Sequence, residues 1–543
     1  MTDPRRVAQV ATAVLAVAIV GLPLASLVGV AVEDGPAGLA RALGGPLALT
    51  AVVNTIWTSA TVALLATATG TAAALLTERW AGTARTRLRA LLLAPLIMPP
   101  FVLAFGWARA FGPRGLTDQL LGIELPGLYG PLGIVLVISI AATPLTYLVV
   151  AGALGSRVEP DLELAARAAG AGPLTTLRTV TLPLLRPALA SAAVVAFVFG
   201  ANAFGVPAVL GSPAGFTTIT TRLYQDLAFS ADPVAFQRAT TLATTLVVLA
   251  VVVVGGADAL LGRRRAGRTG LPSGSGRSGI AGRLALAVVG VVLLVTIVLP
   301  FVALVLAALT RAAGLAPVPA NWTLANFGEA VDGRFVGGLL RSVGLAVAAA
   351  TIVLGLGAVA AVAARSRRSG ALGTAVTLGF AIPGSALAVA VLLAYGGWLR
   401  DTLALILVAY LAKFWALGHR QLAGSLDRLP VDLLRAARAS GAGPLATLTT
   451  VVGPILRPSL AAAWILVFMF AIHELTMSSL LYGPGTATLA VVVLGVQQLG
   501  DPGVSAALAV LLTAIVALAA LPLVVMRGGW DARVPGLPRE AGG

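Results

Sequence analysis

The sequence contains no cysteine, two histidines, His419 and His473, and one lysine, Lys413. Without cysteine the chain forms no disulfide, thiolate metal site or thiol nucleophile. A phosphate-binding loop of the Walker type needs Gly-Lys-Ser/Thr, whereas Lys413 lies between Ala412 and Phe414. The chain therefore lacks this ATP site, and energy from ATP must come from another polypeptide. We predict no catalytic residue, no metal site and no cofactor in this chain.

Charged residues are also scarce, at 11%, whereas 58% of the residues are hydrophobic and the mean hydropathy is +0.97. A soluble domain with this composition could not hydrate its surface. We therefore predict an all-α polytopic membrane protein. The net charge of +16 does not indicate nucleic acid, because the arginines form short clusters between apolar runs, as the positive-inside rule predicts.

The apolar runs predict about twelve membrane spans, since a spanning helix needs about 20 mostly apolar residues. The arginine clusters all fall on one side under this count, which places both termini of a multi-pass membrane protein in the cytoplasm. The expected spans are residues 7–32, 50–77, 88–112, 131–155, 187–210, 234–260, 284–310, 338–364, 370–396, 402–424, 459–482 and 504–526.

A basic, glycine- and serine-rich stretch divides the chain. Residues 262–282 are typical of a flexible cytoplasmic linker. The first half is then 1–261, with a core of 50–261, and the second half is 283–526, with a core of 338–526. Residues 527–543 form a cytoplasmic tail. Because each half has an even number of spans, the two halves are parallel and related by an axis along the membrane normal.

One polar segment occurs in both halves. DLELAARAAGAGPL at residues 161–174 matches DLLRAARASGAGPL at 432–445, with an offset of 271 residues. Alanine, leucine and arginine favour helix, whereas glycine ends a helix and proline suits the first turn of the next. The pattern predicts a helix, a tight turn and a second helix in each half. The residues concerned are Ala165, Ala166, Gly170, Gly172, Pro173 and Pro183, and Ala436, Ala437, Gly441, Gly443, Pro444 and Pro454.

This repeated segment resembles the cytoplasmic signature of binding-protein-dependent ABC transporter permeases, which is Glu-Ala-Ala, three residues, Gly and a later Leu-Pro. The small pair corresponds to Ala165/Ala166 and Ala436/Ala437, and the glycine to Gly170 and Gly441. The acidic position departs from the signature, because it holds Leu164 in the first half, with Glu163 one residue earlier, and Arg435 in the second. Leu182 keeps the Leu-Pro pair, whereas Gly453 does not.

The resemblance implies a protein of the bacterial inner membrane with two MetI-like halves, each with a coupling helix that docks on an ATPase. Two ATPase copies would then carry the ATP and Mg, and an extracytoplasmic binding protein would deliver a small solute. The segments at 204–211, 216–224 and 474–486 look like those of fused iron(III) permeases, so the resemblance implies ferric iron as cargo. Relatives of similar layout carry thiamine, polyamines or aminoethylphosphonate. The repeated segments could instead be interfacial helices anchored by arginine.

Few polar residues lie within the expected spans. Asn202 in the fifth span matches His473 in the eleventh at the common offset, and Glu474 follows His473. Ionisable groups at membrane depth usually face a cavity or a partner. We hypothesise that Asn202, His473 and Glu474 line the translocation path and that Lys413 neutralises Glu474. The alternative is that these residues are hydrogen-bonded contacts between helices.

Prolines interrupt the third and ninth expected spans at matched positions, Pro99-Pro100 and Pro383-Gly384. A broken helix can form a gate where its backbone faces a cavity, and an ordinary kink is the alternative. The rival function is a 6+6 secondary transporter driven by an ion gradient. Such a transporter would need carboxylates within the spans to bind the coupling ion, and the spans contain few carboxylates. The sequence contains no cluster of His, Asp or Cys residues of the kind that would indicate an enzyme.

Overall fold

The computed structural model describes residues 10, 14–33, 35–158, 160–261, 280–312, 314–364, 382–427, 429 and 431–530. Within these ranges most residues are helical, and the β-structure consists of one isolated bridge between Thr310 and Trp322. The fold class predicted from composition is therefore confirmed. Most of the predicted linker, the end of the predicted tail and part of the ninth expected span lie outside the described residues.

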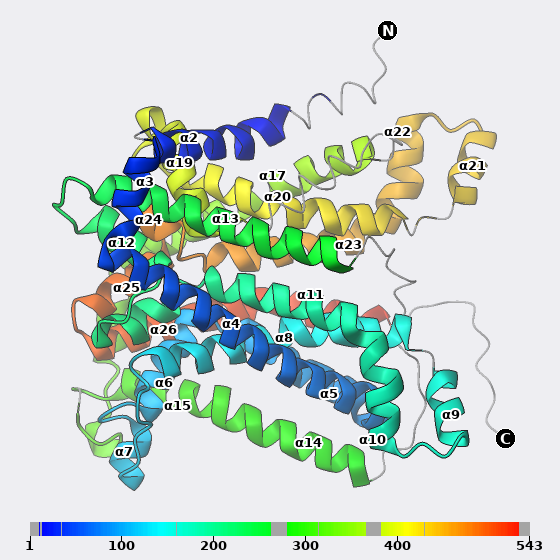
Figure 1. Cartoon of the computed structure of the whole chain (residues 1–543), viewed down its shortest axis with the longest axis horizontal. Helices are drawn as coiled ribbons and strands as arrows, with labels where there is room; N and C mark the ends of the chain where they lie inside the picture. Colours follow the sequence, from blue (N-terminus) through cyan, green and yellow to red (C-terminus); the bar gives the residue numbers. More distant parts are fainter. Residues whose placement is uncertain are drawn as a thin grey trace.

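The first half contributes twelve of the described α-helices to a helical bundle, in which the long helices run side by side (Figure 1). They are α2 (Leu22–Val32), α3 (Gly35–Gly44), α4 (Pro46–Leu75), α5 (Arg85–Leu93), α6 (Pro100–Phe111), α7 (Leu116–Leu121), α8 (Pro131–Arg157), α9 (Pro160–Ala168), α10 (Pro173–Thr176), α11 (Leu182–Ala201), α12 (Ile219–Ala228) and α13 (Ala235–Leu261).

The second half repeats this order. Its α-helices are α14 (Ile280–Leu293), α15 (Leu299–Leu309), α16 (Ala325–Ala330), α17 (Gly333–Ala364), α19 (Gly384–Leu399), α20 (Leu403–Asp427), α21 (Val431–Ala439), α22 (Pro444–Thr447), α23 (Gly453–Ile472), α24 (Ser478–Leu481), α25 (Leu489–Gln498) and α26 (Pro502–Trp530).

Short π and 3₁₀ segments continue or join these helices. The π segments are η1 (Val17–Gly21), η2 (Leu76–Trp80), η5 (Leu177–Thr181), η6 (Pro207–Gly211), η8 (Leu294–Val298) and η10 (Leu448–Val452). The 3₁₀ segments are η3 (Gly82–Ala84), η4 (Ala94–Ile97), η7 (Ser212–Ala214) and η9 (Pro319–Asn321). The fifth span, for example, is continuous from Pro173 to Ala201 because η5 joins α10 to α11.

Ten helices of the described residues are long and apolar enough to cross a membrane, and a bent pair brings the number to eleven. The bent pair is the third expected span, in which 85–97 and 100–121 meet at 91°. The ninth expected span is described from residue 382 onward, where α19 contributes 16 residues. The expected set of spans therefore agrees with the described helices, apart from the part of the ninth that lies outside them.

The predicted bounds of the fifth and eleventh spans are wrong. Residues 187–210 and 459–482 were expected, but the helices cover Pro173–Ala201 and Thr449–Ile472. The apolar run continues past Ala201 because the following loop and η6 are packed inside the protein, where Val209 and Leu210 are buried. A buried loop and a spanning helix are equally apolar, so composition did not distinguish them.

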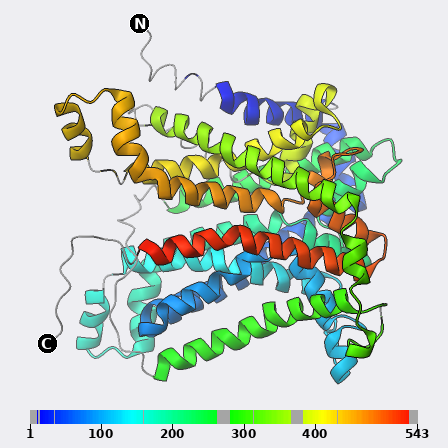
Figure 2. The same ribbon diagram turned by 180° about the vertical axis from the view of Figure 1, so that it is seen from behind.

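The first and seventh spans pack across the boundary between the halves. The first span, η1 and α2, contacts α19 and α20 of the second half, and Leu27 is buried with Ala386. The seventh span, α14 and α15, contacts α5 and α6 of the first half, where Ala285 is buried with Leu88. Figures 1 and 2 show these two spans along opposite sides of the bundle. Each half is therefore flanked by a span of the other.

The main hydrophobic core is shared by both halves. Phe101 and Phe204 from the first half belong to one buried cluster with Leu475 and Met477 from the second. At the same level, the Tyr224 hydroxyl in α12 lies 3.3 Å from Oε1 of Gln498, at the end of α25. The halves are thus joined by a continuous apolar interior, around which the long helices run side by side (Figure 2).

Candidate functional site

Two short helical segments project from the same end of the bundle (Figure 1). We call residues 160–176, which contain α9 and α10, the first elbow. Residues 431–447, which contain α21 and α22, form the second elbow. The predicted helix, turn and helix are therefore confirmed in both halves. We call this end of the bundle the elbow end, and α3, α7, α12 and α25 lie at the opposite end (Figure 1).

The turn of each elbow depends on a glycine in the left-handed region. Gly170 has φ +86° and Gly441 has φ +80°. In the first elbow the Gly170 N–H donates to Arg167 O, and the Ala171 N–H donates to Ala166 O at 3.0 Å. In the second, the Ala442 N–H donates to the carbonyl oxygen five residues earlier, also at 3.0 Å. These bonds close both helices in the Schellman pattern, which fixes the angle of each elbow.

The second arm of each elbow begins at proline. Pro173 and Pro444 are the first residues of α10 and α22, where the missing N–H of proline costs nothing. Gly172 before Pro173 is extended, with φ −68° and ψ 169°, as the residue before proline usually is. Pro183 and Pro454, the later prolines of the signature, lie in the first turns of α11 and α23. The elbows therefore lead directly into the fifth and eleventh spans.

The exposed surface of the elbows carries apolar side chains among charged ones. Ala165 and Ala436 are exposed, whereas Ala166 and Ala437 are half-buried against the rest of the elbow. Larger apolar side chains surround these alanines, and those at least 43% exposed are Leu162, Leu164, Leu174 and Leu433. Leu164 and Arg435, which replace the acidic residue of the signature, are both exposed. Small and apolar side chains together leave a surface that another protein can approach closely.

Glu163 connects the first elbow to the bundle. Its side chain is buried, Oε2 lies 3.3 Å from Arg79 Nε, and Oε1 accepts a hydrogen bond of 2.8 Å from the Thr181 hydroxyl. Arg79 also donates to Val158 O at 3.3 Å. One carboxylate thus ties α9 to η2, at the end of the second span, and to η5. The position equivalent to Glu163 in the second half is Leu434, so this tie exists in one elbow.

A second acid at the elbow end is Glu78, whose side chain is fully buried. Its carboxylate lies 2.7 Å from Arg89 Nη2 and 3.7 Å from Arg85 Nε. The Tyr147 hydroxyl lies 3.5 Å from Oε1. Sequence reasoning missed Glu78, although its position as the one acid in an arginine cluster at the end of a span was a usable signal. Its contacts join η2 to α5 and α8.

The two matched polar residues, Asn202 and His473, end their helices. Asn202 is the C-cap of α11 and His473 is the C-cap of α23, so their equivalence holds although neither lies inside a span. The loops that follow, residues 202–206 and 473–477, meet at the centre of the bundle, where Gly205 lies against Phe101 and Leu475. We call them the central loops. Asn202 Oδ1 is buried without a hydrogen-bond partner among the described residues, and the His473 side chain interacts with the backbone of Met469, one turn earlier in α23.

Glu474 and Lys413 make their hydrogen bonds to different groups. The Glu474 carboxylate accepts from the Met477 N–H at 2.9 Å and from the Ser478 N–H at 3.0 Å. It therefore caps the start of α24. Lys413 Nζ donates to Ile382 O at 2.7 Å. No salt bridge between Lys413 and Glu474 occurs among the described residues. The two charges interact at longer range than a salt bridge, and the neutralisation of Glu474 by Lys413 stays a hypothesis.

The matched prolines lie at the starts of helices. Pro100 is the first residue of α6, after an extended Met98 and Pro99, and the chain bends there by 91°. Pro383 caps α19, which begins at Gly384. Gly384 lies against Met477 in the loop after α23. Both breaks therefore adjoin the central loops, since Phe101 contacts Gly205 in the same way.

Comparison with known proteins identifies the family to which this chain belongs. A family model described as binding-protein-dependent transport system inner membrane component matches residues 66–266 and 353–534. The chain belongs to this family. It is an ABC transporter permease of the fused type, since the family match occurs twice, once in each half. The expectation from the repeated elbow motif is therefore confirmed.

Relatives of this permease include both full-length and half-length proteins. It is 25% identical over 494 residues to the ferric transport system permease protein of Actinobacillus pleuropneumoniae, covering 87% of this chain and 70% of that one. It is 23% identical to an Fe(3+)-transport system permease protein of Haemophilus influenzae, covering 88% and 91%. The molybdenum transport system permease protein of Mycobacterium bovis is 34% identical over 220 residues, covering 39% of this chain and 80% of that one.

At the end opposite the elbows, the permease carries a buried acid that sequence reasoning also missed. The Asp226 side chain in α12 is fully buried, and Oδ1 lies 2.6 Å from both Arg222 Nη2 and Arg238 Nη2. Arg238 also pairs with the exposed Asp232 at 3.0 Å. The Val234 N–H and the Arg238 guanidinium hold the pKa of Asp232 below its ordinary value. This cluster fixes α12 to the start of α13, the sixth span.

The described residues contain no group of three or more His, Asp or Glu side chains placed to hold a metal ion. What the described part of the permease offers is mechanical: two exposed elbows at one end and two facing loops at the centre. Each elbow runs through a span into one of those loops, because α10–α11 and α22–α23 end at Asn202 and His473. Movement of an elbow along its span would therefore move a central loop.

Proposed function

We propose that this permease is the membrane subunit of an ABC importer whose two elbows dock on two ATPase copies. The observation that carries the proposal is the pair of exposed, glycine-hinged elbows at one end of the bundle, each continuous with a span. An ATPase that closes on nucleotide would push both elbows together. The exposed leucines and alanines supply the apolar contact that such docking needs. The ATP and Mg then belong to the partner subunits.

We propose that the elbow end faces the cytoplasm. Arg79, Arg85 and Arg89 all lie at that end, because their partners Glu78 and Glu163 hold them beside the first elbow. Clustered arginines favour the cytoplasmic side of a bacterial membrane. The opposite end would then meet an extracytoplasmic binding protein, and both termini would be cytoplasmic.

We propose ferric iron as the cargo. The ferric and Fe(3+) permeases match over 87% and 88% of this chain, whereas the molybdenum permease matches over 39%. Both iron permeases match across the two halves of this chain, in the same fused arrangement, and this supports the ferric assignment. Since the described residues hold no cluster of metal ligands, selection of the metal would belong to the binding protein. Thiamine, polyamines and aminoethylphosphonate remain the alternative cargoes.

The central loops are the proposed path. Asn202 and His473 end the fifth and eleventh spans at matched positions, and the buried Oδ1 of Asn202 has no partner among the described residues. Alternating access would expose these two residues when the loops separate. Glu474 and Lys413 would contribute charge beside the path rather than contact with the cargo.

The test is ATP hydrolysis by the purified permease with its ATPase in lipid nanodiscs. We expect the binding protein loaded with Fe(3+) to raise hydrolysis severalfold above the unloaded binding protein. Binding proteins loaded with molybdate, thiamine, a polyamine or aminoethylphosphonate serve as parallel samples. Stimulation by one of these in place of iron would overturn the cargo. Uptake that continues without any ATPase would overturn the importer and favour an ion-driven transporter.

A further inference from the structure

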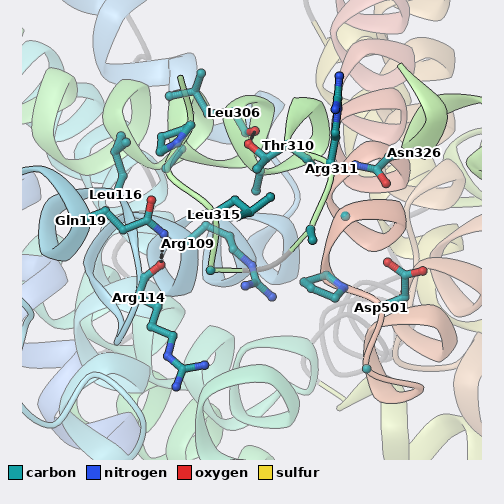
Figure 3. Close-up of a pocket in the computed structure, with 18 of the residues that line it drawn as sticks. Arg109, Arg114, Leu116, Gln119, Leu306, Thr310, Arg311, Leu315, Asn326 and Asp501 are labelled. Carbon is teal, nitrogen blue, oxygen red and sulfur yellow. Dashed lines mark hydrogen bonds between the residues drawn. The ribbon is translucent and has the colours of Figure 1, made fainter. Parts of the chain in front are cut away.

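A cavity of about 430 Å³ opens at the end of the bundle opposite the elbows. It lies between α6 and α7 of the first half, α15 and α16 of the second, and the start of α26. Figure 3 shows its polar and apolar walls. Three arginines, Arg109, Arg114 and Arg311, line it together with Glu329 and Asp501. None of the residues that line the cavity belongs to the loops that follow α11 and α23, so the cavity is distinct from the proposed path.

Arg109 dominates the chemistry of this cavity. It comes from the last turn of α6, it is partly buried, and its guanidinium points into the opening (Figure 3). Neither a hydrogen bond nor a salt bridge joins the guanidinium of Arg109, Arg114 or Arg311 to any residue in the described ranges. A guanidinium withdrawn from water without a partner is unfavourable. A ligand that supplies acceptor oxygens would compensate for the lost hydration of the Arg109 guanidinium.

The acids at the cavity are already occupied or exposed. Oδ1 of Asp501 accepts from the Val504 N–H at 3.0 Å and so caps α26. Asp118, beside the cavity in α7, accepts from the Arg114 N–H at 2.8 Å. Glu329 is exposed to solvent. The lining therefore carries three guanidinium groups against two carboxylates, and the most enclosed charge is positive.

The apolar part of the lining favours a position of the cavity near the membrane surface. Leu116, Leu306 and Leu315 line one side of it. Close by, Leu121 in α7 and Leu499 after α25 are 69% and 80% exposed. Exposed leucines at the end of a bundle of spans are at the level where acyl chains meet phosphate headgroups. Arginine forks match phosphate oxygens in bidentate geometry.

We propose that this arginine cavity binds a phosphate-type oxyanion, with Arg109 as the main donor and Arg114 and Arg311 at its rim. The same oxyanion is available from the headgroup of an anionic phospholipid and from free inorganic phosphate. Its binding would join α6 to α15 and α26, and so stabilise the contact between the first half and the crossing seventh span.

The experiment measures thermal unfolding of the full chain in a maltoside detergent, which carries no phosphate. One sample is titrated with short-chain phosphatidylglycerol, a second with inorganic phosphate and a third with uncharged diacylglycerol. We expect the unfolding midpoint to rise in at least one of the first two titrations, because a ligand that binds the folded state stabilises it. A rise with the lipid alone assigns the headgroup, and a rise with both assigns the oxyanion itself.

The deciding variant is Arg109→Gln. We expect its apparent dissociation constant for the stabilising anion to be about 10- to 100-fold weaker, as for the loss of a charge-assisted hydrogen bond. Arg334→Gln is the matched control, because Arg334 is an exposed arginine at the same end, paired with Asp332, and it should respond as the wild type does. If Arg109→Gln does not fold, Arg109→Lys replaces it, with a smaller loss. No response to either anion, or a wild-type response of the Arg109 variant, overturns the site.

Discussion

At the scale of single residues, the permease places buried acids among arginines at both ends of its bundle. Glu78 and Glu163 stand at the elbow end, and Asp226 at the opposite end. A buried carboxylate is costly unless it is paired, and removing one partner leaves the other charge uncompensated. These three residues therefore act as fixed points that hold loops to the ends of spans.

Glu163→Gln should loosen the first elbow. The substitution removes the ion pair to Arg79 while keeping the size of the side chain, and we expect a loss of about 1–3 kcal/mol in unfolding free energy. It should also lower the solute transported per ATP hydrolysed, because the elbow would move without its span. Unfolding and coupled uptake are the two measurements.

The control for Glu163→Gln is Asp432→Asn in the second elbow. Asp432 and Arg435 are 91% and 75% exposed, and an exposed pair contributes about 1 kcal/mol or less. Equal effects of the two substitutions would show that the tie from Glu163 to the bundle has no mechanical role.

Asp226→Asn should destabilise the opposite end. Two arginines, Arg222 and Arg238, would lose the carboxylate that both contact at 2.6 Å, and breaking such a buried cluster costs about 3–5 kcal/mol. Chemical unfolding of the purified permease would measure the change. Asp332→Asn is the comparison, since its pair with Arg334 is exposed; a loss as small as that of Asp332→Asn would contradict the prediction.

At the scale of elements, the elbow depends on the sign of one backbone angle. Gly170 has φ +86°, whereas Gly172 two residues later has φ −68°. Alanine at Gly170 should cost about 1 kcal/mol and partly uncouple ATP hydrolysis from uptake, while alanine at Gly172 should be tolerated. Proline at Gly170 or Gly441 should uncouple the two fully, since proline fixes φ near −65°.

The readouts for the elbow variants are hydrolysis and uptake measured on the same proteoliposomes. Insertion into the membrane should be normal in all of them, which protease accessibility would check. Wild-type coupling in both proline variants would refute the elbow as a lever, and equal coupling in the two alanine variants would refute the role of the left-handed glycine.

The loop after α23 gives a separate prediction, because Glu474 caps α24 and Lys413 bonds to a carbonyl oxygen. Glu474→Gln retains one acceptor oxygen, so we expect transport to continue with a stability loss of about 1–2 kcal/mol. The charge swap, Lys413→Glu with Glu474→Lys, removes the cap and should abolish transport. Full transport by the swapped protein would show that the opposite charges matter more than the cap.

The elements that sequence reasoning predicted well are those with local rules. Glycine followed by proline specifies the elbows through φ and the missing N–H, and composition specifies the spans. The ends of the fifth and eleventh spans were misplaced because η6 is as apolar as a span. Contacts between residues far apart in the chain, such as Arg79 with Glu163, follow from the packing of different spans and leave no local pattern.

At the scale of the whole molecule, one span of each half packs against the other half. The first span packs on α19 and α20, and the seventh on α5 and α6. A chain divided between residues 261 and 280 should therefore still assemble, since each piece exposes an apolar flank that the other covers. We expect the two pieces, produced together, to copurify and to retain transport.

Copurification of tagged pieces measures this, and a first piece that starts at residue 35, without its first span, is the control. That shortened piece should bind the second half more weakly, because Leu27 and its neighbours no longer cover α19. Equal recovery of both first pieces would contradict the role of the crossing span.

The crossing of the first span also sets an order of events during synthesis. Its partner α19 lies about 350 residues further along the chain, which the ribosome reaches about 20–70 s later. Its neighbour α13 in the first half is made earlier, so the first span can pack on α13 while its contacts with α19 wait for the second half. The contact between the first span and α19 is therefore among the last to form during synthesis.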